Sequence, residues 1–159
     1  MSSSPDEVAA QFDTAKKLVE DATLRPGLEP AKVRGEGGAN LASWCIRRGS
    51  ASTVVSVSKS DRGDAAYLRA ISPVMSLPPE RGPLDFFRRL LEPNGQGLVN
   101  AAFGIMGDEV VVKSERPTDF LDPAGVEQII LHLSAVADTY DDRLVRELGG
   151  QRASDLGAP

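Results

Sequence analysis

Residues that carry chemistry are scarce in this sequence of 159 residues. It holds one cysteine, Cys45, one histidine, His132, and one tryptophan, Trp44, and aromatic residues make up only 5% of it. One cysteine cannot form an internal disulfide, and zinc or iron sites need several histidine, cysteine or carboxylate ligands at workable spacing. We therefore expect no internal disulfide, no metal site and no cofactor.

Long hydrophobic runs are also missing. A helix that crosses a bilayer needs about 20 predominantly apolar residues, and the longest apolar runs here are only a few residues. The first seven residues, Met-Ser-Ser-Ser-Pro-Asp-Glu, lack the basic segment and apolar stretch of a secretory signal. We expect a cytoplasmic protein without a membrane partner, and the single cysteine fits a reducing compartment.

Positive charge is in deficit. The sequence has 18 lysines and arginines against 23 aspartates and glutamates, a formal net charge of −5. Affinity for nucleic acid comes mainly from basic side chains that neutralise phosphates, so nucleic acid is not an expected partner. Several basic residues do gather in the middle third, where alternating strands favour a solvated sheet face: Arg47, Arg48, Lys59, Arg62 and Arg69.

What is present is typical of one globular domain, with 41% hydrophobic and 26% charged residues. Ser4, Pro5 and Glu7 have the spacing of a helix start, with a capping serine, a proline at the first helical position and a capping-box glutamate. An apolar stripe follows at three- and four-residue steps and ends before Pro26-Gly27. Its members are Val8, Phe12, Ala15, Val19 and Ala22.

Three β-prone runs come next, after the glycine-rich residues 35–38. They cover residues 39–48, 53–58 and 67–77, and polar turns separate them at Gly49-Ser50 and at residues 61–64. Pro73 lies inside the third run and cannot donate a ladder hydrogen bond. We expect that strand to be at a sheet edge, bulged or broken there.

The second half of the sequence predicts two helices around a hairpin. A short helix over residues 83–91 should stop at Pro93-Asn94-Gly95, and residues 98–106 and 109–114 should pair through a Gly107-Asp108 turn. In the first of these strands Val99, Ala101, Phe103 and Ile105 share one face, and both strands are expected to be half buried. Asp122-Pro123 opens a last helix that Gly149-Gly150 closes. Its apolar stripe is Val126, Ile129, Ile130, Leu133, Val136, Tyr140 and Leu144.

The element order is therefore α-βββ-α-ββ-α. Short turns between successive strands favour an antiparallel sheet with helices packed on it, which is an α+β fold in a single domain. Residues 1–150 are expected to form this domain. Residues 151–159, which are small, polar and helix-breaking, are expected to be a disordered tail.

Candidate catalytic groups are few. A Cys45 and His132 nucleophile-and-base pair would need the fold to bring the two together, and no local motif supports it. Asp138, Asp141 and Asp142 cluster on the last helix without the loop of a calcium site. They are interpreted as a solvated helix face, and the sequence predicts no catalytic residue.

The second half of the chain also carries a family resemblance. It rests on the stretch 98–105, the Gly107-Asp108 turn, residues 109–112, Pro117 and the helix from Pro123. These resemble the closing hairpin and helix of the bacterial YbjN-like family, which is similar in shape to the class I type III secretion chaperones. The resemblance covers nearly the whole chain through its element order.

The resemblance implies binding rather than catalysis. Secretion chaperones are acidic homodimers that hold an unfolded effector segment, and YbjN-like proteins are described as regulators of sensory transduction. We accordingly expect a non-catalytic adaptor or chaperone-like regulator that binds a protein client of unidentified sequence, as a homodimer. An exposed sheet edge could add a strand of that client. The alternative is a small-ligand sensory domain with a pocket between the sheet and the last helix.

Six residues are the candidates for a partner or dimer interface. Phe86 and Phe87 adjoin on a short helix, so one of them can cover a partner subunit, unless a wide apolar face buries both. Trp44 is a possible anchor, although a strand tryptophan is more often a core residue. The full set is Phe86, Phe87, Leu90, Trp44, Val55 and Val57.

Overall fold

The computed structural model describes residues 4–24, 29–31, 39–78 and 84–156. It confirms the α+β fold and the predicted order of its main elements, and adds a short strand after the first helix. The elements are α1 (Pro5–Thr23), β1 (Glu29–Ala31), β2 (Leu41–Arg48), β3 (Ala51–Lys59), β4 (Ala66–Ser76), α2 (Leu84–Gln96), β5 (Ala102–Met106), β6 (Glu109–Pro117), η1 (Thr118–Phe120), α3 (Pro123–Leu148) and η2 (Ala153–Leu156).

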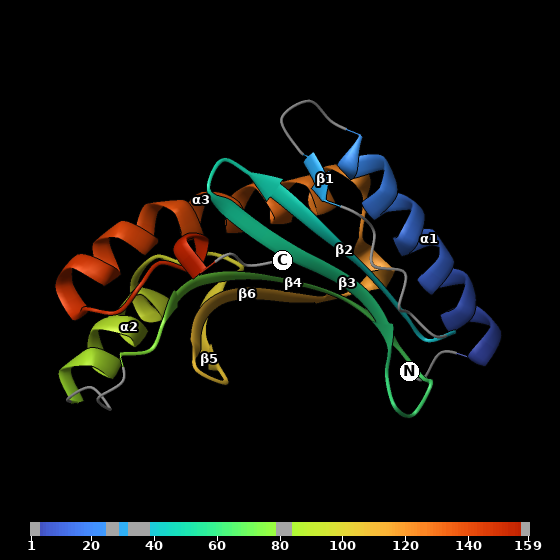
Figure 1. Cartoon of the computed structure of the whole chain (residues 1–159). Helices are drawn as coiled ribbons and strands as arrows, with labels where there is room; N and C mark the ends of the chain where they lie inside the picture. The colour runs from blue at the N-terminus through green and yellow to red at the C-terminus, as the bar shows by residue number, and fades with distance from the viewer. Residues whose placement is uncertain (1–3, 25–28, 32–38, 79–83, 157–159) are drawn as a thin grey trace.

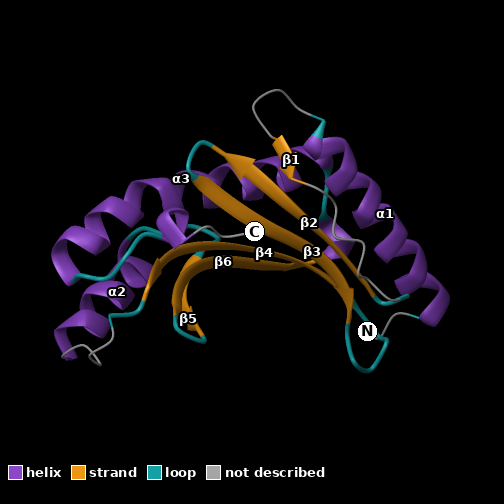
Figure 2. Cartoon of the chain, viewed as in Figure 1, coloured by secondary structure: helices purple, strands orange, loops and turns teal. Residues whose placement is uncertain are grey.

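The strands form one antiparallel sheet in the order β1-β2-β3-β4-β6-β5. After β4 the chain forms α2 and then β5, which is an edge strand of the sheet. Strand β6 follows and lies between β5 and β4. Figure 1 shows the curved sheet with α1 at one end of the molecule, α2 at the other and α3 crossing behind β2 and β3. The secondary-structure colouring of Figure 2 shows how these helices frame the sheet.

Side chains alternate between a helix-covered face and an open face of the sheet. Across one row of paired residues, Trp44 lies opposite Val55, Val55 opposite Ala70 and Ala70 opposite Ser114, and all four are buried. The neighbouring row on the other face, which includes Val54 and Lys113, is more exposed. Because the strand period is two, this alternation places one continuous core between the sheet and the helices.

Both long helices begin and face the sheet as the sequence predicts. The Ser4 hydroxyl accepts a hydrogen bond from the backbone N–H of Glu7, while the Ser4 N–H donates to the Glu7 carboxylate and lowers the pKa of that group. The Asp122 carboxylate likewise accepts from the N–H of Gly125 at 2.6 Å. Every member of the predicted α1 stripe is buried, and so is every member of the α3 stripe except the half-buried Tyr140.

A buried hydroxyl network fixes α3 on the sheet. The Thr53 hydroxyl of β3 lies 2.6 Å from that of Ser72 on β4 and 3.1 Å from that of Ser134 on α3. Ser134 also donates to the carbonyl oxygen of Ile130 and Ser72 to that of Ser52. Buried polar groups are costly unless each is hydrogen-bonded, so this set of bonds favours one position of the helix along the strands.

Pro73 does not mark a sheet edge. Its strand, β4, lies between β3 and β6, and the irregularity is a register shift in the pairing with β6 between Pro73 and Met75. The missing N–H of proline is accommodated at this bulge. The sequence predicted an edge position, a bulge or a break at Pro73. The structure confirms the bulge, and the edge position is wrong.

The predicted end of the short helix at Pro93 is also wrong, because α2 continues to Gln96. The Asn94 side chain accepts a hydrogen bond from the N–H of Phe103 at 2.7 Å and donates to its carbonyl oxygen at 3.1 Å. The last turn of α2 is thereby fastened to the outer edge of β5. This tertiary contact outweighs the helix-breaking tendency of Pro93, and it occupies backbone groups that a partner strand would need.

Strand β5 is shorter than predicted, since it begins at Ala102 rather than at residue 98. Asn100 has a φ of 59°, a left-handed conformation that asparagine tolerates better than most residues and that a strand excludes. Val99 is consequently in a loop and 67% exposed, and Ile105 is 41% exposed. The expectation that Val99 belongs to this strand face is therefore wrong, whereas Phe103 and Ile105, two residues apart in β5, do share one face.

The expected disordered tail does not hold for residues 151–156. The Ser76 N–H donates to the carbonyl oxygen of Gln151 at 2.9 Å, Arg152 forms a bridge with Met75, and Ala153 is buried. The chain thus returns along the end of β4 after α3. Small and polar residues can be ordered by backbone pairing, which composition does not reveal. The other features predicted at Pro26-Gly27, residues 35–38, Pro83 and residues 157–159 lie outside the described residues.

Candidate functional site

A groove of about 670 Å³ opens between the sheet and the first half of α3. Its floor and sides come from the loop before β5, the end of β6, the η1 turn and α3. The sequence-based alternative of a sensory domain placed a pocket between the sheet and this helix. The lining residues are Val99, Asn100, Arg116, Phe120, Leu121, Gly125, Gln128, Ile129, Leu131, His132 and Leu133.

Arg116 enters this groove because of its place in β6. It lies opposite Leu68, and it continues the period-two series of Val112 and Ser114, which are buried on the helix-covered face. The register therefore turns the Arg116 side chain toward the helices rather than toward the open face. At the end of the sheet the core gives way to the groove, and Arg116 is half-buried there.

The charge of Arg116 is not compensated within the part of the chain that the structure describes. Two arginines of that part are half-buried, Arg116 and Arg152. Arg152 pairs with the carboxylates of Asp142 at 2.9 Å and Asp155 at 3.0 Å. The Arg116 side chain makes no ion pair or hydrogen bond with a described residue. Buried charges are normally paired, so a half-buried arginine whose side chain has no partner stands out.

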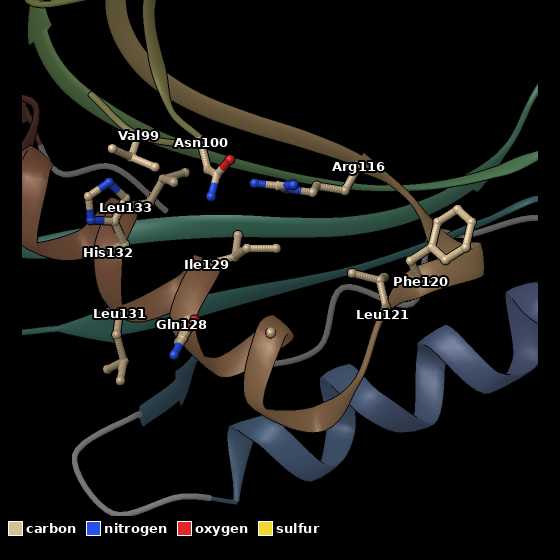
Figure 3. Close-up of a pocket in the computed structure, with 11 residues that line it drawn as sticks. Val99, Asn100, Arg116, Phe120, Leu121, Gln128, Ile129, Leu131, His132 and Leu133 are labelled. Carbon is tan, nitrogen blue, oxygen red and sulfur yellow. The ribbon is translucent and has the colours of Figure 1, made fainter. Parts of the chain in front are cut away.

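The other lining residues suit an elongated ligand with apolar and polar parts. Figure 3 shows the Arg116 guanidinium and the Asn100 amide pointing toward one another above Ile129, with His132 nearby on α3. The described residues that line the groove include one arginine and one histidine and no acid. Phe120 and Val99 lie at the rims, where they are 92% and 67% exposed. Such a groove can take a carboxylate between apolar side chains.

A second exposed apolar feature lies on α2. Leu84, Phe87 and Leu91 are 84%, 38% and 53% exposed and are spaced by three and four residues along the helix, so they share one side of it. Phe86 and Leu90, on a neighbouring side of the helix that faces the core, are buried at 2% and 1%. We call the three exposed residues the α2 stripe. Its apolar area faces solvent in the single chain.

A comparison with protein-family models shows to which family the chain belongs. Residues 13–156 match the model of the family described as T3SS (YopN, CesT) and YbjN peptide-binding chaperone 1, or TY-Chap1. The chain belongs to the TY-Chap1 family. The resemblance to YbjN-like proteins and type III secretion chaperones is therefore confirmed.

Solved structures share the fold of this TY-Chap1 chain. A chain of the ExsC–ExsE complex superposes with a TM-score of 0.58 at 17% identity, covering 84% of this chain and 95% of that one. A chain of the HopA1–SchA chaperone–effector complex gives 0.54 at 12% identity, covering 82% and 95%. No curated protein matches the sequence. At sequence identities of 17% and 12%, these similarities show a shared fold.

The structure buries most of the interface candidates of this TY-Chap1 chain. Phe86, Leu90, Trp44, Val55 and Val57 are all at most 4% exposed and belong to the core cluster. They have no surface left for a partner, because their strand or helix positions turn them inward. Phe87 is the exception. Of the two outcomes left open for these adjacent phenylalanines, the structure places Phe86 in the core and leaves Phe87 38% exposed, so Phe87 stays a candidate as part of the α2 stripe.

Cys45 and His132 lie on different sides of the sheet. Cys45 alternates with the buried Trp44 and Ile46, so it is on the open face, where its Sγ lies 3.1 Å from the Ser52 Oγ. His132 is exposed on α3 and borders the groove. The fold does not bring this pair together. Within the described ranges, no group of three or more histidine, cysteine or acidic residues could hold a metal ion.

The acidic cluster of α3 is only partly solvated, which corrects the sequence-based interpretation. Asp138 and Asp142 are exposed, and Asp138 accepts a hydrogen bond from the Ser50 hydroxyl at 2.6 Å, whereas Asp141 is 8% exposed. Burial raises the pKa of Asp141, a hydrogen bond from the Asp142 N–H opposes this increase, and the charges of Asp142 and Asp138 raise the pKa further.

Of the helices that the structure describes, none is long and apolar enough to span a membrane.

Asp141 should make stability depend on pH. Its folded-state pKa lies above the ordinary value of 3.8, so folding takes up a proton between the two values. The free energy of unfolding contributed by this group is therefore highest below pH 3.8 and falls as the pH rises through the folded-state pKa. We expect Asp141→Asn to raise the free energy of unfolding at pH 7 by up to about 1 kcal/mol, with a smaller gain at acid pH.

Urea unfolding at several pH values measures this effect. Asp61→Asn is the matched control, because Asp61 is exposed in the turn between β3 and β4. A gain for Asp141→Asn that is equal at all pH values would show that the buried charge is not its cause.

Proposed function

We propose that this chain is a non-catalytic, cytoplasmic adaptor that holds an extended segment of a protein client, and that it acts as a homodimer. The observation that carries the proposal is the match of residues 13–156 to a family of peptide-binding chaperones. The separation of Cys45 from His132 supports a binding role over an enzymatic one. The open groove and the α2 stripe supply two distinct apolar surfaces, one for the client and one for the second subunit.

Peptide binding is tested directly with a random peptide library displayed on phage and selected on the full chain. The proposal expects enrichment of related sequences over an unrelated folded domain. Selected peptides, synthesised with a fluorescent label, should then bind saturably. Enrichment no greater than that of the unrelated domain would count against the proposal.

The α2 stripe is the expected dimer contact. Replacing Leu84, Phe87 and Leu91 together by serine should convert a dimer into a folded monomer, because the three side chains are exposed in the single chain and contribute little to its core. Light scattering coupled to size exclusion measures the mass, and circular dichroism checks folding.

Leu24→Ser provides the matched control. Leu24 is 81% exposed at the end of α1, close to the 84% of Leu84, but it lies outside the stripe. Its replacement should leave the dimer intact. A wild-type chain that stays monomeric at high concentration, or a triple variant that stays dimeric, would contradict the assignment.

The groove also favours a second function, a sensory domain for a small ligand. A pocket of about 670 Å³ falls in the range of small-molecule sites. Thermal unfolding across a panel of metabolites separates the two functions, because a ligand that binds only the folded state raises its melting temperature. A large stabilisation by one metabolite, without peptide selection, would favour sensing.

A further inference from the structure

The uncompensated charge of Arg116 indicates what the groove is built to receive. Arg116 is half-buried as a residue, and neither an acid nor a hydrogen-bond acceptor among the described residues pairs with its guanidinium. Its planar fork of N–H donors matches a carboxylate in a bidentate arrangement. The chain has more acids than bases, 23 against 18, yet none of the described residues that line the groove is an acid.

We propose that the groove binds the client peptide through an aspartate or glutamate side chain, whose carboxylate pairs with the Arg116 guanidinium. Apolar peptide residues on either side of that acid pack against Val99 and Phe120. This inference rests on the proposed peptide-binding function and deepens it, since it names the residue class that the chain selects.

Asn100 completes the polar centre of the groove. Its side-chain amide lies close to the tip of the Arg116 side chain in Figure 3, so both groups border the same part of the groove. Asn100 lies in an exposed loop, with a backbone φ of 59°. A carboxylate oxygen accepts more than one hydrogen bond, so the arginine and the amide can bind the same group.

The exposure of the rims favours a peptide over a small carboxylic acid. Phe120 and Val99 are 92% and 67% exposed, so both large side chains are free to contact a chain that continues beyond the groove. A small-molecule site commonly encloses most of its ligand. Here only the centre, with Arg116 and Ile129, is sheltered, which suits one anchored side chain on a passing peptide.

The experiment compares matched peptides on matched variants. Peptides are selected from the random library on the wild-type chain, and each is synthesised with its acidic residue and with the corresponding amide. Because hydrogen bonds to charged groups are the strong ones, the change from acid to amide should weaken wild-type binding by about ten- to a hundredfold. For Arg116→Gln, the two peptides should bind within about twofold of each other, and Arg116→Lys should keep part of the preference.

Arg146→Gln is the charge-matched control. Arg146 is exposed on the same helix that borders the groove, but it does not line it, so the preference for acid should survive its replacement. Thermal melts establish that each variant is folded. The difference between two peptides on one variant also cancels any general effect of the substitution on the chain.

The possible outcomes separate the inference from the function on which it rests. Selected peptides that lack an enriched acid, or that keep their acid preference in Arg116→Gln, would overturn the role of Arg116 while leaving peptide binding intact. A library that yields no binder would overturn both. Glutarate or acetate that competes as strongly as the acidic peptide would replace the peptide by a small carboxylate as the occupant.

Discussion

Replacing Trp44 by alanine is expected to lower the free energy of unfolding by about 3–5 kcal/mol, the usual cost of removing a large aromatic side chain from a core. Trp44 is 4% exposed, lies opposite Val55 in the sheet and faces the helices. A loss of this size is a large part of the stability of a single domain. Urea unfolding followed by circular dichroism measures it.

Trp44→Phe is the informative companion, since it keeps an aromatic ring in the site and should cost much less. The alternative role of Trp44 as an anchor for a partner makes the opposite prediction. A Trp44→Ala variant with unchanged unfolding but lost dimerisation or peptide binding would establish the anchor and would contradict the core assignment.

A Gly150→Ala substitution is expected to cost about 2–4 kcal/mol and to release the segment that follows it. Gly150 has a φ of 92°, in the region that L-residues avoid. An added Cβ would also lie 2.8 Å from the carbonyl oxygen of Ser76 and 2.9 Å from the Met75 Cε. The substitution therefore combines backbone strain with a clash at the strand with which Gln151 and Arg152 pair.

Gly149→Ala separates the two contributions. Gly149 also has a positive φ, 78°, but a Cβ there meets nothing within 4 Å. Gly149→Ala should therefore lower the free energy of unfolding only by the backbone strain of a left-handed L-residue, about 1–2 kcal/mol. Urea unfolding compares the two variants, and hydrogen exchange of the Ser76 amide, which bonds to Gln151, reports the release. Equal costs for both glycines, with Ser76 still protected, would contradict the proposed packing of this segment.

The fold was largely predictable because local signals agreed with one another. The capping residues Ser4 and Asp122 and the apolar stripes of α1 and α3 report directly on helix starts and faces, and the structure confirms them. The errors concern residues whose state depends on distant contacts. Pro93 is typical of a helix end, but Asn94 ties the next turn to Phe103, which belongs to another element.

The site was harder to predict than the fold. The interface candidates share hydrophobicity, which is the same property that puts Val55 and Val57 in the core. Hydrophobic character alone does not separate a core residue from an interface residue. Arg116 was missed because the predicted strand ended at residue 114. Extending the period-two pattern of Val112 and Ser114 by one step would have placed an arginine on the inward face, which is the available signal.

The C-terminal segment shows a further limit of composition. Residues 151–156 have the small and polar character of a disordered tail, yet Gln151 pairs with Ser76, and Arg152 is bonded to the carboxylates of Asp142 and Asp155. Backbone pairing and ion pairs need partners that lie outside the segment. A pattern within the segment cannot contain them.

A titration of a library-selected, labelled peptide with the full chain, followed by mass analysis of the recovered peptide, tests the central claim that the chain binds peptides without transforming them. Fluorescence anisotropy should rise to saturation, fall back on competition with unlabelled peptide, and leave the peptide mass unchanged. A signal that never saturates with any selected peptide, or a peptide recovered with altered mass, would contradict the account.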